Sequence, residues 1–300
     1  MPTPPAPSRP DLVRGLQERA ARALPAEYVE HLDGWWLRHT TGSAWWAGTV
    51  LPHGDAARLD PGGPLDPNGR LAPTGPLDLN GQIAPTGPLD LRGRVAAVEK
   101  FYAGYAAAPR FQITPGTCPS GLDPLLAERG YRRESPMTLR CAPTTAVLAQ
   151  APTGSLRGSA CASTGPLRVR VDDHPTSAWF DVWHAVHGQG AEPRSEWDLL
   201  GRVNRHSAYA CALSDGEVIA VSRAVADEGW AGVFGMATIP RARGKGAARA
   251  VLAALADWAG SHEAHRMYLQ VERDNAPALR LYDRAGFGEV CGYHYRGGAG

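Results

Sequence analysis

The sequence predicts an α/β protein that is built from two lobes. Its 300 residues exceed the usual size of one domain, and a hydrophobic content of 43% with 20% charged residues fits globular cores. Short apolar runs alternate with amphipathic stretches, which is the pattern of strands alternating with helices. One order of elements occurs twice, because helix, strand, helix, Gly, aromatic residue and strand follow one another near residues 95–141 and again at 247–295.

The N-terminal half opens with a predicted helix, because apolar residues recur at helical spacing over residues 11–24 and Pro25 follows them. Two strands around a Thr-Gly-Ser turn are expected at 34–39 and 44–51. Further along, periodicity and turn residues predict a helix at 95–107, a strand at 110–114, a helix at 122–129 and a strand at 137–141.

The C-terminal half begins with an alternating apolar pattern at residues 167–171, which predicts a strand. Two helical stretches with clustered aromatic and aliphatic residues are expected at 177–187 and 192–204. Residues 209–213 and 218–226 predict two strands of a hairpin, because a Ser-Asp-Gly turn separates them.

The most informative stretch follows this hairpin. Residues 230–238 predict a strand, which Pro240 ends because it has no N–H to donate to a sheet. A turn with Gly244 and Gly246 leads into a predicted amphipathic helix at 247–259. The first N–H groups of a helix lack intrahelical partners and its dipole is positive there, so this order of elements predicts an anion site.

Basic side chains in the turn support this interpretation. Arg241, Arg243 and Lys245 supply full positive charges that suit a pyrophosphate. The spacing excludes two common phosphate loops. A Walker loop needs Ser or Thr after Gly-Lys, but Gly246 follows Lys245. A dinucleotide loop needs a small residue at the position where Arg249 stands.

The remaining pattern, Arg-x-x-Gly-x-Gly-Ala, resembles the acetyl-CoA loop of the GCN5-related N-acetyltransferase (GNAT) family. A second segment, residues 275–287, is similar to the family's Asn-x-x-Ala-x-x-Leu-Tyr-x-x-x-Gly-Phe pattern at every fixed position. A predicted strand at 267–271 precedes it, and the two motifs follow one another in the family's order. The resemblance covers about residues 167–297.

The resemblance implies an α/β fold with two GNAT-like lobes, each a mixed, mostly antiparallel sheet (α+β) flanked by helices. It implies an acetyl-CoA-dependent N-acetyltransferase, with acetyl-CoA as cosubstrate, that acts on a primary amine of a small molecule or a protein by direct transfer. In the family, the strands matching 236–238 and 267–271 splay apart, so that the pantetheine arm of the cofactor runs between them. A backbone N–H near Met236 then faces the thioester oxygen. The residues expected to bind the cofactor are Met236, Ala237, Thr238, Arg241, Arg243, Gly244, Lys245, Gly246, Ala247, Ala248, Asn275 and Tyr282.

Tyr282 is the expected catalytic residue, a general acid that protonates the leaving thiolate. The general base is not marked by spacing, and the candidates are Glu196, Glu217, Glu228 and Glu272. His184 and His187 are expected to be structural or surface residues and not metal ligands. Acidic and aromatic residues cluster between residues 172 and 198: Asp172, Asp173, Asp181, Glu192, Glu196 and Asp198 with Trp179, Trp183 and Trp197. This region suits the binding of a cationic amine, or it is equally an ordinary solvated face.

The N-terminal half, residues 11–142, is expected to be a degenerate GNAT-like lobe that does not hold acetyl-CoA. Its residues 125–131 align with 281–287, but Leu126 stands where the second motif has Tyr282. A Pro/Gly-rich tandem repeat occupies the place of the phosphate loop, with Pro-Leu-Asp at Pro64, Pro76 and Pro88, and predicts a mobile loop at 60–94. The other expected boundaries are a disordered tail at 1–10, a linker at 143–165 and the catalytic domain at 166–300.

Composition narrows the functional classes further. A net charge of +1 lacks the basic surplus of nucleic-acid binders, and no apolar run is long enough to span a membrane. The five cysteines form no Cys-x-x-Cys pair, so neither a disulfide framework nor a metal site is indicated, and we expect a cytoplasmic protein. The partners expected are therefore acetyl-CoA and an amine acceptor, and the sequence leaves a homodimer open. The alternatives are a catalytically weak regulatory module that binds CoA or acyl-CoA and a purely structural protein.

Overall fold

The computed structural model describes residues 9–53, 89–150, 167–188 and 190–298. Most of the predicted tail, most of the repeat and most of the predicted linker lie outside these ranges. The elements of the N-terminal half are α1 (Arg9–Ala23), β1 (Tyr28–Leu32), β2 (Trp35–His39), the 3-10 turn η1 (Trp45–Ala47), β3 (Leu51–Pro52), α2 (Leu91–Ala103), β4 (Arg110–Ile113), α3 (Leu122–Glu128), β5 (Arg132–Pro143) and α4 (Thr144–Ala149).

The C-terminal half contains helices and strands close to those predicted. Its elements are β6 (Leu167–Asp172), α5 (Ser177–His187), α6 (Pro193–Gly201), β7 (Ser207–Ser214), β8 (Glu217–Asp227), β9 (Trp230–Thr238), the 3-10 turn η2 (Pro240–Ala242), α7 (Ala247–Ser261), β10 (Arg266–Glu272), α8 (Ala276–Arg284) and β11 (Gly288–Gly297). This is the α/β fold that the sequence predicts, a mixed sheet with helices on both faces.

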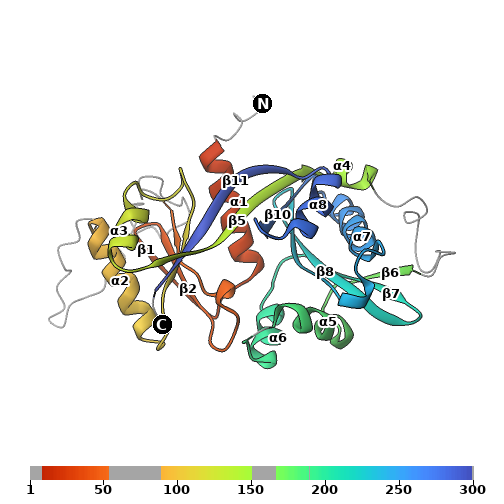
Figure 1. Ribbon diagram of the computed structural model, residues 1–300, viewed down its shortest axis with the longest axis horizontal. Helices are drawn as coiled ribbons and strands as arrows, with labels where there is room; N and C mark the ends of the chain where they lie inside the picture. The colour runs from red at the N-terminus through yellow and green to blue at the C-terminus, as the bar shows by residue number, and fades with distance from the viewer. Residues whose placement is uncertain (1–8, 54–88, 151–166, 189, 299–300) are drawn as a thin grey trace, which may run out of the picture.

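One eight-stranded sheet continues through both halves in the order β4-β11-β5-β10-β9-β8-β7-β6, beside a three-stranded sheet β1-β2-β3. In Figure 1, β5 and β11 run across the molecule between the N-terminal elements at one end and the C-terminal elements at the other. The β9–β10 pair is parallel, whereas β6 to β9 pair as antiparallel neighbours.

The two halves exchange strands where they meet in this sheet. Strand β5 pairs antiparallel with β10 and β11, and it therefore separates two strands of the C-terminal half. Strand β11 pairs antiparallel with β4 and β5, and it separates two strands of the N-terminal half in the same way. Each half thus completes the sheet of the other. The N-terminal half also has a parallel bridge, Val50 to Phe111, that joins β3 to β4 as β9 joins β10.

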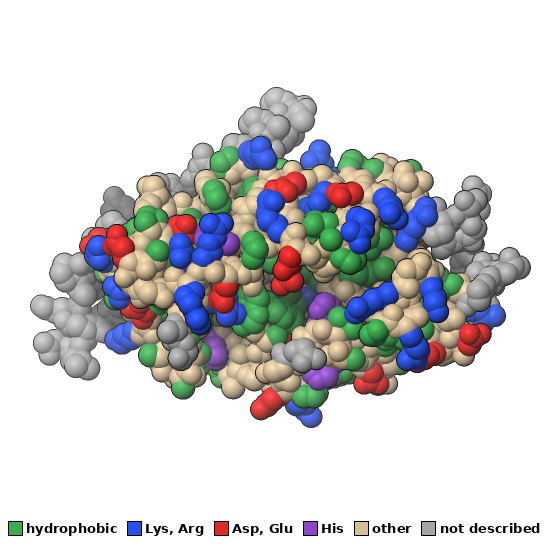
Figure 2. Space-filling view, in the orientation of Figure 1, with side chains coloured by type: hydrophobic (Ala, Val, Ile, Leu, Met, Phe, Trp, Pro, Cys, Tyr) green, Lys and Arg blue, Asp and Glu red, His purple; other side chains and the backbone are tan. Residues whose placement is uncertain are grey.

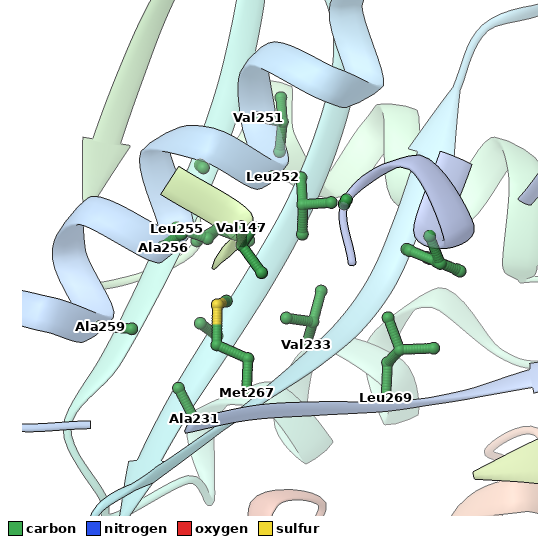
Figure 3. Close-up of a cluster of buried hydrophobic side chains, with 14 of the residues drawn as sticks. Val147, Ala231, Val233, Val251, Leu252, Leu255, Ala256, Ala259, Met267 and Leu269 are labelled. Carbon is green, nitrogen blue, oxygen red and sulfur yellow. The ribbon is translucent and has the colours of Figure 1, made fainter. Parts of the chain in front are cut away.

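Helices cover the two faces of the C-terminal sheet differently. Alternate residues of β7 point to opposite faces, so Ala208, Ala210 and Ala212 pack under α7 whereas Tyr209 and Cys211 pack with α5. Figure 1 shows α7 and α5 on these opposite faces. Figure 3 shows the α7 side of the core, which contains Val251, Leu252, Leu255 and Ala256 from α7, Val233 from β9, Met267 and Leu269 from β10, and Val147 from α4.

The structure differs from the sequence-based expectations mainly in the N-terminal half. The predicted strand at 44–51 is a 3-10 turn followed by the two-residue β3, and β1 was not predicted. The start of the predicted linker forms α4, because Val147 is buried against the α7 core. The repeat loop ends before residue 94, since Asp90 caps α2 and the helix starts at Leu91. In the same way, α1 begins at Arg9, inside the predicted tail. Across the ranges that the structure describes, no helix has both the length and the apolar character of a membrane span.

Candidate functional site

The central feature of the site is a gap in the sheet between β9 and β10. The two strands pair only from Trp230 with Arg266 to Val233 with Leu269. Beyond that point β9 continues to Thr238 and β10 to Glu272 without pairing to each other. This is the splayed arrangement that the resemblance implies.

A bulge in β9 lies at the start of the gap, where the register with β8 shifts between Val221 and Arg223. Gly235 in this bulge has a φ of +61°, which disfavours any residue with a Cβ. A Cβ here would also lie 2.5 Å from Nε1 of Trp183, so the close approach of α5 requires glycine.

Beyond the bulge, the peptide groups of Met236 and Thr238 face the gap. The N–H of Ile239 donates to the carbonyl of Ile219 at 3.0 Å, which directs Ile239 and, by alternation, Ala237 toward β8. Met236 and Thr238 therefore point to the other edge. Their carbonyls are already partnered, because Nε2 of His187 lies 3.2 Å from Met236 O and Nε of Arg243 lies 3.3 Å from Thr238 O. The N–H groups on this edge also face the gap, where a ligand that lies along the strand could accept them.

A cavity of about 1030 Å³ occupies this region and extends to the start of α7. Its wall takes residues from both faces of the sheet, with Val186 and His187 from α5 on one side and α4, α7 and α8 on the other. The cavity therefore passes through the sheet at the gap. Its volume is about that of pockets that bury a whole small ligand.

The wall of this cavity is strongly positive. Arg243, Arg249, Arg280 and Arg284 line it, and none of the wall residues in the described part of the chain is Asp or Glu. Figure 2 shows Lys and Arg side chains gathered over α7 and α8. Arg280 and Arg284 have no ion-pair partner among the described residues, and Arg249 is held by the carbonyl of Gln150 at 2.8 Å. Such a wall suits a ligand with several phosphate charges.

The start of α7 adds backbone donors to this wall. Gly246 is the N-cap of α7 with a φ of +85°, and Gly244 has a φ of +76°. Both conformations favour glycine, and the positions where a Cβ would stand face open space. No side chain in the described ranges caps α7, so its first N–H groups stay available to an anion.

The structure brings most of the predicted cofactor residues onto this one wall. They are Met236, Thr238, Arg243, Gly244, Gly246, Ala247, Ala248 and Asn275. Ala237 is buried on the β8 side, Arg241 pairs with Glu217, and Lys245 is exposed and lies outside the wall. Asn275 caps α8, since its Oδ1 accepts the N–H of Ala278 at 3.2 Å.

Sequence reasoning missed four charged or titratable wall residues: Arg249, Arg280, Arg284 and His187. Arg280 and Arg284 are one helical turn apart and fall in the second motif, so helical periodicity could have placed both of them beside the phosphate loop. His187 gives no such signal, because its position depends on α5 packing on the opposite face of the sheet.

Tyr282 lies beside the cavity but not on its wall, although Ala278, Leu281 and Ala285 of the same helix line it. The side chain is 6% exposed and its ring lies 5.8 Å from that of Phe287. Its hydroxyl has no hydrogen-bond partner among the described residues. Burial raises the pKa of Tyr282 to about 12, so the phenol keeps its proton at neutral pH and can only donate it.

None of the four candidate bases lies on the cavity wall. Glu217 pairs with Arg241 and Glu228 with Arg19, and both carboxylates are exposed. Glu272 is exposed at the end of β10. Glu196 is fully buried and accepts the N–H of Ala44 at 2.6 Å, and burial raises its pKa.

The acidic and aromatic region of α5 and α6 does not come together as one site. Trp179 and Trp183 are buried in the core, and three of the acids pair with neighbours: Asp172 with Arg170, Asp173 with His174 and Asp198 with Arg194. A separate cavity of about 430 Å³ lies between the two helices, and Asp181 and Trp197 line it. The paired charges favour a solvated face for most of this region.

Comparisons with known proteins agree with the fold. Residues 171–287 match the model of the acetyltransferase (GNAT) family. The uncharacterized N-acetyltransferase YobR of Bacillus subtilis (strain 168) is 22% identical over 292 residues, which cover 95% of this chain and 98% of that protein. A GCN5-related N-acetyltransferase from Kribbella flavida has a similar structure, with 14% identity, a TM-score of 0.61 and coverage of 96% of this chain and 95% of that one.

A second solved structure is also similar over a large part of the chain. A tandem GNAT protein from the clavulanic acid biosynthesis pathway has 13% identity and a TM-score of 0.52, with 72% of each chain covered. At these identities the structures show the fold alone, whereas the family model matches the segment that carries both motifs. The domain at residues 171–287 therefore belongs to the GNAT family of acyltransferases, and the fold of the chain is one that tandem GNAT proteins share.

Proposed function

We propose that this protein is an acetyl-CoA-dependent N-acetyltransferase that moves an acetyl group to a primary amine of a small molecule or a protein. The observation that carries the proposal is the cavity through the gap between β9 and β10. It has cationic side chains and a helix N-terminus on one side, and the free edge of β9 in the middle. A long carrier with phosphates at one end and a thioester at the other fits this distribution of charge.

The residues that would hold the carrier follow from the wall. Arg243, Arg280 and Arg284, with the first N–H groups of α7, suit the phosphates. The N–H groups of Met236 and Thr238 suit the amides of an extended arm, in the way that a strand adds to the edge of a sheet. When bound, the thioester supplies an activated acetyl group. The N–H of Met236 would donate to its oxygen as negative charge develops there, which lowers the barrier.

Tyr282 is the general acid of this proposal. A buried phenol with a pKa of about 12 is protonated at every physiological pH, and it can donate a proton to a thiolate that leaves beside α8. Its position beside the cavity and the absence of a competing hydrogen bond within the described ranges support this role.

We also propose that only the C-terminal lobe binds the cofactor. In the N-terminal lobe, α2 connects β3 to β4 along the chain, as α7 connects β9 to β10 in the C-terminal lobe. Its N-cap Asp90 uses a carboxylate oxygen to accept the N–H of Gly93 at 2.7 Å. A carboxylate at this position occupies the helix end and repels phosphate. Leu126, which aligns with Tyr282, is fully buried and has no proton to donate.

The test combines binding with turnover. Calorimetry should find one acetyl-CoA per chain, and a panel of primary amines should release CoA thiol and yield an acetylated amine by mass spectrometry. Replacing both Arg280 and Arg284 by Ser should weaken binding by at least about tenfold, because charged hydrogen bonds to phosphate contribute roughly 1.5–3 kcal/mol each. The matched control is Arg92→Ser, an exposed arginine of α2 far along the chain from the cavity.

The outcomes separate the alternatives. Tight binding without transfer to any amine would favour a regulatory module that binds CoA. No binding at all would contradict the proposal and favour a structural role. Equal loss of affinity in the double variant and in Arg92→Ser would mean that the cationic wall does not hold the phosphates.

A further inference from the structure

His187 occupies an unusual position for a residue at the end of a packed helix. It lies in the last turn of α5, on the face of the sheet opposite α7, yet it lines the same cavity as Arg243 and Arg280. The cavity reaches α5 only through the gap between β9 and β10. The imidazole therefore lies at the end of the cavity away from the cations of α7 and α8, where an acceptor amine would meet the thioester.

The hydrogen bond of His187 fixes its tautomer. Nε2 lies 3.2 Å from the carbonyl oxygen of Met236, and a carbonyl can only accept a hydrogen bond. Nε2 therefore carries the hydrogen. In a neutral imidazole the other nitrogen, Nδ1, then has a free lone pair. Nδ1 has no hydrogen-bond partner in the part of the chain that the structure describes.

The surroundings of His187 keep it neutral. Burial lowers its pKa, and the bond to Met236 acts in the opposite direction with a smaller effect. The charged side chains on the same wall are all cations, namely Arg243, Arg249, Arg280 and Arg284, and the other titratable group on α5 near it is His184, one turn earlier. Because the ring is neutral before the reaction, Nδ1 can accept a proton during it.

The ring also lies close to the proposed reaction centre. The N–H and the C=O of one strand residue point to the same edge of the strand. The imidazole binds the C=O of Met236, and the N–H of Met236 is the group that would face the thioester oxygen. The two positions therefore differ along the strand by no more than about one residue rise, roughly 3.3 Å. The four glutamates that sequence analysis offered as bases are absent from the wall that the described residues form.

We propose that His187 is a catalytic residue, whose Nδ1 accepts a proton from the amine as it attacks the thioester. This inference rests on the proposed function. The amine nitrogen forms the new C–N bond and becomes cationic, and its proton passes to Nδ1. The C–S bond breaks with its electron pair on sulfur, and the thiolate takes a proton from Tyr282. His187 later releases its proton to water, and the Tyr282 phenolate takes a proton from water, which restores both groups.

The variant His187→Gln separates this role from a structural one. The Gln amide can still donate to the Met236 carbonyl, but it has no basic nitrogen near neutral pH. We expect kcat to fall by about 100-fold or more, because general-base catalysis commonly contributes 10² to 10⁴. The acetyl-CoA Kd should change less than about threefold, since no phosphate contact is lost. The acidic limb of the kcat–pH profile, with an inflection below 6.5, should disappear. The control is His174→Gln, a side chain 75% exposed ahead of the same helix.

A readout without turnover tests the geometry itself. Nitrogen-15 NMR of the imidazole at pH 7 should find the neutral tautomer protonated at Nε2; a hydrogen on Nδ1 or an imidazolium would overturn the proposal. Full kcat with an unchanged acidic limb in His187→Gln would overturn the role of His187 and leave the proposed function standing. Loss of that limb in Glu272→Gln instead would assign the base to Glu272. A wild-type protein that binds no acetyl-CoA would remove the proposed function, and the role of His187 with it.

Discussion

Replacing Tyr282 with Phe tests the chemistry of the site with little disturbance of the fold. The hydroxyl has no hydrogen-bond partner among the described residues, and the ring packs against Phe287 with 5.8 Å between centroids. Removing an unpaired buried hydroxyl leaves the packing in place, so the free energy of unfolding should change by less than about 1 kcal/mol. The midpoint of thermal unfolding should therefore stay nearly constant.

Catalysis should respond very differently. A general acid commonly contributes 10² to 10⁴ in rate, which corresponds to roughly 3–5.5 kcal/mol of transition-state stabilisation. We therefore expect kcat for thiol release to fall by about 100-fold or more in Tyr282→Phe, with the acetyl-CoA Kd unchanged within about threefold. Because the pKa of Tyr282 is about 12, the wild-type rate should not decline through this group between pH 7 and pH 10.

The assay follows CoA thiol release with a saturating amine from pH 6 to pH 10, beside thermal unfolding of the same samples. Tyr293→Phe is a matched control, since this tyrosine is also buried, at 4% exposure, but lies on β11 outside the cavity wall. If Tyr282→Phe keeps full kcat at every pH, the assignment of the acid is wrong. If both variants lose the same activity, the loss reflects packing and not proton transfer.

Two further predictions concern the framework of the site. Gly235→Ala should destabilise the protein by about 2–4 kcal/mol, because a φ of +61° disfavours Ala and its Cβ would lie 2.5 Å from Nε1 of Trp183. Urea unfolding measures this, and an unchanged midpoint would show that the bulge can relax. Burial raises the pKa of Glu196, so the carboxyl group binds its proton more tightly in the folded protein than in the unfolded chain. The protonated carboxyl group therefore contributes to the free energy of unfolding at low pH, and this contribution is lost as the pH rises above 4.5. Glu196→Gln should therefore gain stability relative to wild type between pH 4.5 and pH 8, whereas a constant difference across this range would contradict the burial argument.

The sequence predicted the C-terminal half well because its signals are local. The strand at 230–238, the glycine turn and the helix after it depend on residues that are neighbours in the chain, and β9 and α7 begin where predicted. The gap between β9 and β10 was predicted from the resemblance of the two motifs to the family and not from composition. The limited pairing of the two strands confirms it.

The strand exchange could not be predicted in this way. β5 and β11 pair across about half of the chain, as in Gly288 with Cys141, and no local pattern states which partner a strand will take. The predicted strand at 44–51 failed for a related reason. Its apolar residues fit a strand, but the N–H of Ala44 donates to the carboxylate of Glu196 in α6, and the chain forms a 3-10 turn there.

His187 and the arginines of α8 illustrate the same limit for the site. The motif residues were found because they share one short loop, whereas His187 reaches the cavity only because α5 packs across the sheet from α7. Its helix spacing alone suggested a structural or surface histidine. The tertiary structure changes this interpretation, because Nε2 of the ring lies within hydrogen-bond distance of the Met236 carbonyl oxygen at the gap.

Hydrogen–deuterium exchange with and without acetyl-CoA tests the central claim most directly. If the carrier lies along the gap with its phosphates on the start of α7, the amides of Met236, Thr238 and the first turn of α7 should exchange more slowly in its presence. The start of α2 in the N-terminal lobe should not change. Protection at α2, or no protection at residues 236–250 under saturating acetyl-CoA, would contradict the account.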